Sequence, residues 1–394
     1  MYTIADIDVF VMTHNRADFL KETLDCLLYQ TARPDRITVF DNESTDDTES
    51  VVRRYESRGV RYVKTTGKDG NFLEMQKRAE RPYVVHFHDD NLFHREYLEK
   101  VLKALNHVQN VAGVTCAYYY FDRSDDPNCQ LLRRGRQLMN QFLIIDSAKE
   151  FCIHKSRAEA RPQDLIVDNV SALVYKTEYF KRRVSMVREY GKADDTELFI
   201  RLLDYGKLVT VSDRLSEFIR QHARRDVNTD SNSLSLQQAK NWVGLYLRQS
   251  AGVNDDNYWD DLLGMIYTQY PYMVKRAVFE ELRTLDFLKV LRADNLIPSS
   301  GLKVYEEFIS GRRTIVSCGI PIAVKDGYSQ FNANESVAAE VLDAKSATEI
   351  DLLRGHVRPL PVRVVRKIVK YIMPYAVVRI VQKIQDRVRF GKSA

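Results

Sequence analysis

Two adjacent carboxylates, Asp89 and Asp90, directly follow an apolar run at residues 83–87 that is predicted to be a β-strand. The segment 95–105 after them has helical spacing. A strand followed by a helix places such a pair at the carboxyl edge of a parallel sheet, where open α/β folds bind ligands. Mg²⁺ and Mn²⁺ suit the pair, because they take one or two protein carboxylates and complete their shell with phosphate oxygens. An isolated Asp-Asp pair is more often a solvated acidic loop, so the rest of the chain decides between the two interpretations.

A second acidic pair, Asp194 and Asp195, begins an amphipathic segment predicted to be a helix at residues 196–203. Negative charge is stabilised at a helix N-terminus, so a carboxylate there tends to stay ionised. An ionised carboxylate can take the proton of an attacking hydroxyl. Asp195 is the preferred general base and Asp194 the competing one. The alternative is that both are only N-terminal helix acids.

The first 110 residues alternate between strand-like and helix-like segments with short connections, which predicts a parallel, doubly wound sheet. The predicted strands are residues 7–12, 36–40, 60–63 and 83–87. The helices between and after them are residues 18–29, a helix starting near 44–47, 70–79 and 95–105. Further strands are expected at 111–121, 170–175 and, as the last one, 208–211, with a polar loop at 123–136.

From about residue 234 the pattern becomes mainly helical and remains so to about residue 296. The predicted helices there are residues 234–249, 258–270 and 274–291. A short β-like stretch at 312–322 has no assigned role. We therefore expect an α/β domain at residues 1–230, a mainly helical domain at 231–357 and a basic tail at 358–394.

Composition fits a soluble protein with a substantial core. The chain has 394 residues, 44% hydrophobic and 29% charged, which suggests two or three domains. No apolar run is long enough to span a membrane, and a signal peptide is not expected from the strand pattern near the N-terminus. The five cysteines are scattered and contain no C-x-x-C pair. They indicate a reducing cytosol and argue against a zinc site or a disulfide framework.

Five segments, taken together, resemble family-2 glycosyltransferases of the GT-A fold, a Rossmann-like fold with a mostly parallel sheet. They occur in that family's order within residues 4–230. The segments are residues 9–16 with the following helix to Thr31, 39–48, 88–91, 194–198 with Arg201 and Gly206, and 215–222. Each motif alone is weak evidence, and the ordered set of five is strong.

The resemblance implies a nucleotide-sugar donor bound at the edge of the sheet. It implies that Asp90 is a metal ligand and that Asp89 contacts the ribose or a metal-bound water. Asn91 stands where the family more often has a third aspartate, so which carboxylate binds metal directly stays open. His222 could complete the metal site with a neutral imidazole. It could equally be a surface residue, with neighbouring arginines binding the diphosphate.

The resemblance also implies that Asp41 and Asn42 contact the base of the nucleotide. A carboxylate at that position can accept the imide N–H of uracil or thymine, which favours a UDP- or dTDP-sugar. The alternative for Asp41 is a capping role. The opposite wall of the base site would consist of four consecutive residues, Thr13, His14, Asn15 and Arg16, with His14 where the family usually has tyrosine.

The C-terminal tail carries most of the positive charge. Residues 358–394 contain ten Lys and Arg against Asp386 alone, a net charge of +9. Subtracting this from the overall +5 leaves −4 for residues 1–357. Apolar residues recur at helical spacing between the cations, which predicts an amphipathic helix on an anionic membrane surface. Nucleic-acid binding is the less favoured use of this charge, and packing on the helical domain or on a second copy of the chain is a third alternative.

These observations predict an inverting glycosyltransferase that depends on Mn²⁺ or Mg²⁺. It would move a hexose from a nucleotide-diphosphate sugar to a hydroxyl of a bacterial surface glycan, such as lipopolysaccharide or capsule, with a lipid-linked acceptor expected. The protein would be cytoplasmic and peripheral on the inner face of the cell membrane. The alternatives are sugar transfer to polyprenyl phosphate and a catalytically silent nucleotide-sugar-binding scaffold. A nucleotidyltransferase is disfavoured, because it would need a glycine-rich phosphate loop and residues 13–19 contain no glycine.

Overall fold

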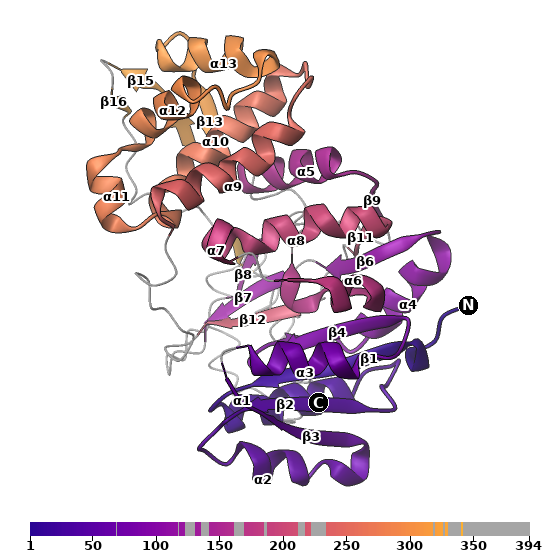
Figure 1. Cartoon of the computed structure of the whole chain (residues 1–394). Helices are drawn as coiled ribbons and strands as arrows, with labels where there is room; N and C mark the ends of the chain where they lie inside the picture. Colours follow the sequence, from indigo (N-terminus) through magenta and orange to yellow (C-terminus); the bar gives the residue numbers. More distant parts are fainter. Residues whose placement is uncertain are drawn as a thin grey trace, which may run out of the picture.

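The computed structural model shows an α/β region followed by a helical region that packs against it (Figure 1). The described residues are 1–67, 69–116, 118–122, 131–134, 142–160, 169–184, 187–211, 217–221, 234–317, 320–325, 328–329 and 340–341. Three features expected from the sequence lie outside them: His222, the tail at 358–394, and two of the five cysteines.

An eight-stranded sheet forms the centre of the α/β region, in the spatial order β3-β2-β1-β4-β10-β6-β11-β9. Its strands are β1 (Ile7–Thr13), β2 (Ile37–Asn42), β3 (Val60–Thr65), β4 (Tyr83–His88), β6 (Val111–Cys116), β9 (Phe142–Ile145), β10 (Val174–Lys176) and β11 (Lys207–Val211). The first four are parallel to one another, as predicted. The chain reverses its direction of travel across the sheet between β1 and β4, which is where open α/β sheets bind ligands.

The other half of this sheet is mixed. β10 lies antiparallel between β4 and β6, and β9 is an antiparallel edge strand beside β11. The strand predicted at 170–175 is correspondingly shorter, because Val170–Ala172 form a 3₁₀ turn before β10. The fold is thus the predicted mostly parallel, GT-A-like sheet followed by helices.

A second, five-stranded sheet has the order β17-β8-β7-β12-β5. Its strands are β5 (Leu92–Phe93), β7 (Tyr118–Asp122), β8 (Leu131–Arg134), β12 (Glu217–Gln221) and β17 (Glu340–Val341). Three predictions are wrong here. The strand expected at 111–121 is divided between the two sheets as β6 and β7, part of the expected loop at 123–136 is β8, and β12 follows the strand expected to be last. The run from 111 to 121 has no break in composition that marks the change of sheet.

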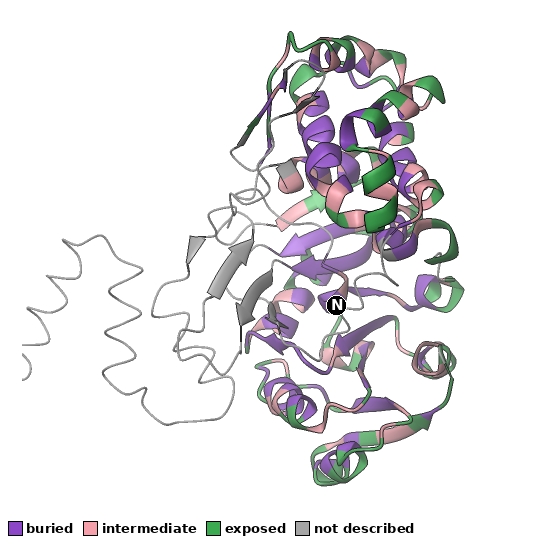
Figure 2. Cartoon of the chain, turned by 90° about the vertical axis from the view of Figure 1, so that its left-hand side faces the viewer, coloured by how far each residue is buried: buried purple, intermediate pink, exposed green. Residues whose placement is uncertain are grey.

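Helices cover both faces of the large sheet. Side chains alternate between the faces of a strand, so Val9 and Val11 pack into one apolar cluster and Phe10 into the other. Helices α1 (Ala17–Leu28), α2 (Thr48–Arg53) and α4 (Tyr97–His107) belong to the first cluster. Helices α3 (Gly70–Arg78), α5 (Ala148–Ala160), α6 (Thr177–Arg182) and α8 (Asp194–Leu202) belong to the second. Figure 2 shows the strands buried between helices whose outer faces are exposed.

The helical region follows β12 in the chain, and its first helix contacts the short helix α7 (Val187–Tyr190). Its elements are α9 (Leu236–Gln249), α10 (Asp256–Met273), α11 (Arg276–Glu281), α12 (Thr284–Ala293), α13 (Ser299–Ile309), and the hairpins β13 (Ile315–Ser317) with β14 (Ile320–Ile322) and β15 (Val324–Lys325) with β16 (Tyr328–Ser329). The single helix predicted at 274–291 is two helices, because the backbone is extended at Leu282. Helix α13 was not predicted, and the β-like stretch at 312–322 is the β13–β14 hairpin.

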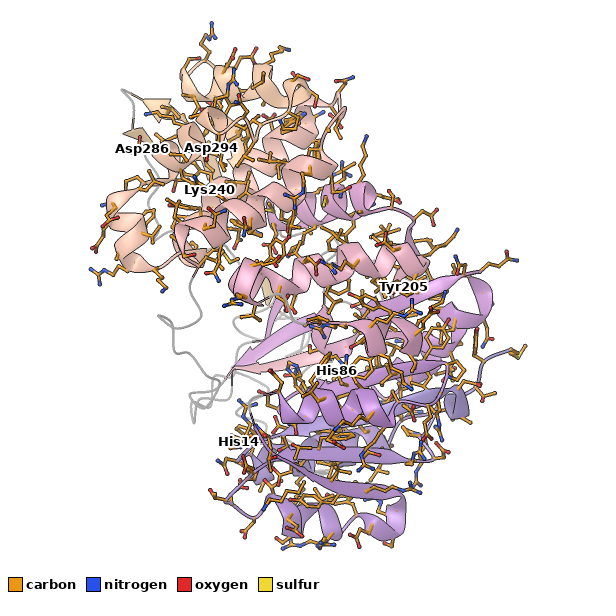
Figure 3. All side chains as sticks on the ribbon, viewed as in Figure 1. His14, His86, Tyr205, Lys240, Asp286 and Asp294 are labelled. Atoms are coloured by element: carbon orange, nitrogen blue, oxygen red, sulfur yellow. The ribbon has the colours of Figure 1, made fainter. Side chains whose placement is uncertain are left out.

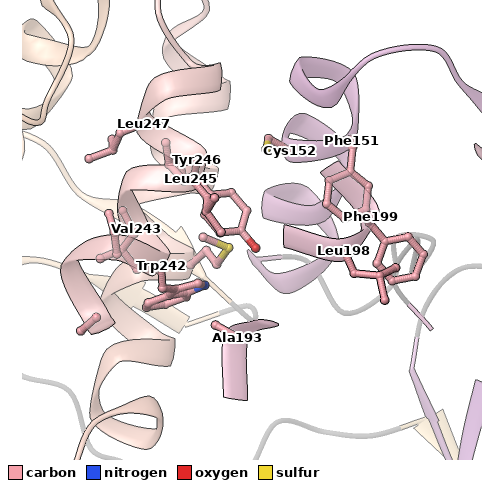
Figure 4. Packing of buried hydrophobic residues seen from close by; sticks show 14 of the residues in the cluster. Phe151, Cys152, Ala193, Leu198, Phe199, Trp242, Val243, Leu245, Tyr246 and Leu247 are labelled. Atoms are coloured by element: carbon pink, nitrogen blue, oxygen red, sulfur yellow. The ribbon is translucent and has the colours of Figure 1, made fainter. Parts of the chain in front are cut away.

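One apolar cluster joins the helical region to the sheet. Figure 4 shows Trp242 and Tyr246 of α9 near Phe151 of α5 and Phe199 of α8. Trp242 is 3% exposed and Tyr246 is fully buried, and burying a large apolar side chain contributes about 1.5–3 kcal/mol to stability. The helical region therefore supports α8, the helix that begins with the second acidic pair.

A close backbone approach also positions α8. Gly191, shortly before this helix, has φ +56°, and a Cβ there would lie 2.4 Å from Cδ2 of Leu234. Glycine is the residue type that adopts such a conformation without a steric penalty. Beyond this contact, the ion pair between Lys240 and Asp294 (2.7 Å, Figure 3) joins α9 to the end of α12.

No helix in the described part of the chain combines the length and the apolar character needed to cross a membrane. The three described cysteines, Cys26, Cys116 and Cys152, are buried free thiols. Burial raises the pKa of the Cys26 thiol to about 12, so this cysteine stays protonated at neutral pH.

Candidate active site

The first acidic pair lies buried at the end of β4. Asp89 is 2% exposed, Asp90 3% and Asn91 fully buried, so the pair is not a solvated acidic loop. Thr13, the last residue of the neighbouring β1, donates a 2.7 Å hydrogen bond from Oγ1 to Oδ2 of Asp89. Nη1 of Arg16 lies 3.0 Å from Oδ1 of Asp89 and 3.2 Å from Oδ2 of Asp90. The structure thus brings four of the predicted site residues together at the point where the sheet reverses.

Burial sets the protonation of Asp89. Removal from water raises the pKa of this carboxyl to about 6, with the neighbouring Asp90 charge acting in the same direction. The Arg16 guanidinium and the Thr13 hydroxyl oppose the shift, because both stabilise the ionised form. The negative charge of the Asp89–Asp90 turn is therefore buried, and a cation bound there would stabilise it.

Side chains of α1 hydrogen-bond the backbone of the turn that contains Asp89 and Asp90. Oγ1 of Thr23 donates to the carbonyl oxygens of Asp89 (2.8 Å) and Asn91 (2.9 Å). Further along α1, Sγ of Cys26 donates to the carbonyl of Phe93. Just after the helix ends, Nε2 of Gln30 donates to the carbonyl of residue 94 (2.8 Å). Thr23 and Cys26 are three residues apart on α1 and so share a helix face. The carbonyls of residues 89, 91, 93 and 94 are therefore hydrogen-bonded by side chains of α1 and of the residue that follows its C-cap.

Asp41 ends β2 at the same sheet edge and is 1% exposed. Its Oδ1 accepts the backbone N–H of Ser44 (3.1 Å), and its Oδ2 accepts the hydroxyl of Tyr62 (2.8 Å). Asp41 is not a helix N-cap, because the N-cap residue of α2 is Asp47. Each carboxylate oxygen has two lone pairs, so the fixed carboxylate keeps acceptor capacity for a ligand N–H.

The loops after β1 and β2 are tied together. Nδ1 of His14 lies 2.6 Å from the carbonyl of Asn42, and His14 is exposed at this edge of the molecule (Figure 3). Asn15 has φ +51°. Its backbone N–H donates to Oγ of Ser44 (2.8 Å), and its Oδ1 accepts the backbone N–H of Thr45 (2.7 Å). The predicted base-binding residues 13–16 and 41–42 thus face one another across hydrogen-bonded loops.

Two further polar residues at this edge were missed from the sequence. Oγ1 of Thr65, at the end of β3, donates to the carbonyl of Asp41 (3.1 Å) and bonds the side chain of Asn71 in α3. Nδ2 of Asn71 in turn donates to the carbonyl of Thr13 (3.5 Å). Thr65 could have been predicted from the sequence, because it follows the predicted strand at residues 60–63 and the carboxyl ends of parallel strands share one edge of the sheet.

The second acidic pair begins α8, as the sequence predicts. Asp194 is 9% exposed and Asp195 is half-buried. Asp194 lines a small cavity of about 160 Å³ together with Arg183, Glu197 and other residues of α6 and α8. Both aspartates lie in the first helical turn, at the positive end of the helix dipole.

A buried polar cluster lies next to Asp195. The hydroxyl of Tyr175 in β10 lies 3.2 Å from Nδ1 of His86 in β4, and His86 is enclosed between strand and helix (Figure 3). Burial lowers the pKa of His86 well below its usual value and raises the pKa of Tyr175, with the Asp195 charge acting on Tyr175 in the same direction. The guanidinium of Arg183 hydrogen-bonds Tyr175 and lies over the ring of Phe72, 5.1 Å from its centroid. β4 thus carries His86 of this cluster and, just beyond its end, the first acidic pair.

The segment expected to end in R-x-H is described in part, as β12 of the second sheet. β12 pairs antiparallel with β5, with Glu217 opposite Phe93 and Phe218 opposite Leu92. His222 follows directly after β12 and lies outside the described residues.

The donor set of the pair fits a divalent cation that also binds phosphate. Among the residues that the structure describes, no cluster of three or more His, Cys, Asp or Glu side chains could hold a metal by itself. Asp89 and Asp90 supply two hard carboxylates, which is the number that Mg²⁺ commonly takes when substrate phosphates provide other ligands. The pair therefore fits a metal shared with a diphosphate and does not form an all-protein cage.

A known family resembles part of this chain. Residues 8–167 match the family model described as Glycosyl transferase family 2. The matching family is one of glycosyltransferases. Over this part of the chain the match confirms the glycosyltransferase resemblance expected from the sequence motifs.

Individual relatives are distant. A Rickettsia typhi protein described as an uncharacterized glycosyltransferase is 24% identical over 119 residues, which are 30% of this chain and 37% of that protein, so the chain spans little more than a third of this relative. The structure of Staphylococcus aureus TarS 1–349 has 15% identity and a TM-score of 0.49, covering 86% of this chain and 98% of that chain. The mannosyltransferase PcManGT of Pyrobaculum calidifontis, in complex with GDP-Man and Mn²⁺, has 17% identity and a TM-score of 0.39, covering 77% and 86%.

Proposed function

We propose that the protein is an inverting, metal-dependent glycosyltransferase that moves a hexose from a nucleotide-diphosphate sugar to an acceptor hydroxyl. The observation that carries this proposal is the buried Asp89–Asp90 pair, held by Thr13 and Arg16 at the switch point of the sheet. The glycosyltransferase family match over residues 8–167 supports the same reaction class.

The donor would lie across the carboxyl ends of β1, β2 and β4. Asp41, fixed by Tyr62 and Ser44, would accept the imide N–H of a uracil or thymine base. The ring of the exposed His14 would offer a flat surface beside the base. A UDP- or dTDP-sugar is therefore the proposed donor.

The diphosphate would lie beside the acidic pair and Arg16. Asp90 and Asp89 would hold Mn²⁺ or Mg²⁺, with His222 as a further proposed ligand. The bound cation would act as a Lewis acid that stabilises the negative charge of the departing nucleoside diphosphate. Arg16 would bind phosphate oxygens, because a guanidinium forms strong, paired hydrogen bonds with them.

Asp195 is the proposed general base, with Asp194 as the competing candidate. Its place in the first turn of α8 favours the ionised form, and partial exposure leaves it accessible to an acceptor. It would take the proton of the acceptor hydroxyl while that oxygen attacks the anomeric carbon from the side opposite the leaving diphosphate. One base and one in-line attack invert the configuration at that carbon.

The acceptor is proposed to be a lipid-linked bacterial surface glycan, reached from the inner face of the cell membrane. The support is the composition of residues 358–394, with ten cations and one acid among regularly spaced apolar residues. Such a segment suits an anionic membrane surface.

A donor screen tests the proposed function. Nucleotide-sugars are added with Mn²⁺, and thermal stabilisation and nucleoside diphosphate release are measured. We expect one donor class to raise the melting temperature and to release its diphosphate only when metal is present. Asp90→Ala should lose release while remaining folded, whereas Asp286→Ala, which removes an exposed acid on α12, should match the wild type. Release that survives chelation, or full turnover in Asp90→Ala, would refute the metal assignment.

A further inference from the structure

A single nitrogen atom lies between the two carboxylates of the first acidic pair. Nη1 of Arg16 is 3.0 Å from Oδ1 of Asp89 and 3.2 Å from Oδ2 of Asp90. The two carboxylate side chains are 2% and 4% exposed, and that of Arg16 is 22% exposed. The Arg16 guanidinium thus contacts one oxygen of each aspartate through the same nitrogen, and these carboxylates are the groups that would hold a divalent cation.

The charge balance explains why an arginine lies there. Two adjacent carboxylates removed from water repel each other, and buried charge is strongly unfavourable without a counter-ion. Arg16 supplies one positive charge against two negative ones. The remaining oxygen of Asp89, Oδ2, is satisfied by the Thr13 hydroxyl. Arg16 therefore offsets part of the negative charge of the buried pair.

We propose that Arg16 is a built-in counter-ion that competes with the divalent cation for the same carboxylate oxygens. The inference rests on the proposed function, since it assumes a metal at this pair. A cation that contacts both aspartates requires the guanidinium to move away. Arg16 immediately precedes α1 and has the most exposed side chain of the three residues, so its head group can move toward solvent.

When it leaves the carboxylates, the Arg16 guanidinium would bind the diphosphate of the donor. Phosphate oxygens are strong guanidinium acceptors, and they would lie beside the metal that both groups share. Displacing Arg16 onto the diphosphate would free the carboxylates for the cation. Metal alone should then bind weakly and metal with nucleotide more tightly. By linkage, metal should strengthen nucleotide binding by the same factor.

Mn²⁺ binding to the full chain, measured by electron paramagnetic resonance without nucleotide, tests the competition. Arg16→Gln should bind Mn²⁺ at least tenfold more tightly than the wild type. Lys21→Gln, which removes an exposed cation from the same helix, should match the wild type. The double variant Arg16→Gln with Asp90→Ala should lose the gain, and Arg16→Lys, which keeps a positive charge, should stay near the wild type. If Arg16→Gln does not fold, Arg16→Met carries the same test.

Equal Mn²⁺ affinity in the wild type and Arg16→Gln would overturn the proposal. So would a gain that persists in the double variant or appears equally in Arg16→Lys. These measurements need neither donor nor acceptor. Failure of sugar transfer with the expected Mn²⁺ result would therefore refute the proposed function alone, and active transfer with unchanged Mn²⁺ affinity would refute the role of Arg16 alone.

Discussion

The hydroxyl of Tyr62 in β3 donates a 2.8 Å hydrogen bond to Oδ2 of Asp41 at the end of β2. Burial and the Asp41 carboxylate both raise the pKa of Tyr62, so the phenol stays protonated and remains a donor at neutral pH. The candidate base-binding carboxylate is thus oriented by a neighbouring strand and does not depend on its own loop alone.

Tyr62→Phe should weaken uridine nucleotide binding without unfolding the protein. The variant keeps the ring and removes the one donor to Oδ2, and a net hydrogen bond is worth about 0.5–1.5 kcal/mol. We therefore expect the dissociation constant for UDP, measured by calorimetry, to rise roughly 2- to 10-fold. Tyr29→Phe, at an exposed tyrosine, is the matched control. Unchanged UDP affinity in Tyr62→Phe would mean that the uracil base does not bind at Asp41.

Thr13→Val should destabilise the turn at the first acidic pair. Valine preserves the shape of threonine but removes the hydroxyl that bonds Oδ2 of Asp89, and loss of a partner by a buried polar group costs about 1–3 kcal/mol. Urea denaturation should show a loss of that order in the free energy of unfolding. Thr66→Val, at an exposed position, should show little change, and equal stability of the two variants would mean that the Thr13 bond is not formed in solution.

The buried His86 predicts a pH dependence of stability. Its pKa is lowered by burial in the folded chain and is close to 6.5 in the unfolded chain. Below about pH 6.5 the His86 site therefore binds more protons in the unfolded state than in the folded state, and the contribution of His86 to stability falls as the pH falls. His86→Gln should reduce this fall in urea midpoints measured between pH 7.5 and 5, whereas His107→Gln, at an exposed histidine, should leave it unchanged. Identical pH profiles for His86→Gln and the wild type would contradict the assignment.

Removing residues 358–394 should abolish most binding to anionic liposomes. The deletion takes away a net charge of +9, and each basic side chain near an anionic surface contributes about 1 kcal/mol. Binding of the full chain should therefore weaken steeply with salt. Nucleotide-sugar binding and activity on a short soluble acceptor should survive, and activity on a lipid-linked acceptor should fall. If the shortened chain unfolds, or changes oligomeric state with unaltered liposome binding, the tail is a packing element.

The sequence predicted the parts of the fold that leave a local pattern. The parallel strands β1 to β4 are buried apolar runs, and the acidic residues that follow them were recognisable because strand ends share one edge. The pairing of strands that are far apart in the sequence leaves no such local pattern. The division of one apparent strand into β6 and β7, and the pairing of β5 with β12, depend on tertiary contacts between segments more than 100 residues apart in the second case.

The same distinction applies to the site. Asp41, Asp89 and Asp90 could be predicted because charged residues are conspicuous after apolar strands. The supporting role of Thr23 could not, because a threonine in an amphipathic helix has no special appearance until the backbone it satisfies is known. The bridging position of Arg16 likewise depends on how α1 meets the turn after β4.

The most direct test of the proposed reaction compares Asp195→Asn with Asp194→Asn once a donor is known. Both donor affinity, by calorimetry, and nucleoside diphosphate release with an acceptor are measured. If Asp195 is the general base, Asp195→Asn should bind the donor as the wild type does and lose turnover by roughly 10²- to 10⁴-fold, while Asp194→Asn keeps most of its activity. Wild-type turnover in Asp195→Asn, or loss of donor binding in both variants, would contradict the assignment of this pair to the chemical step.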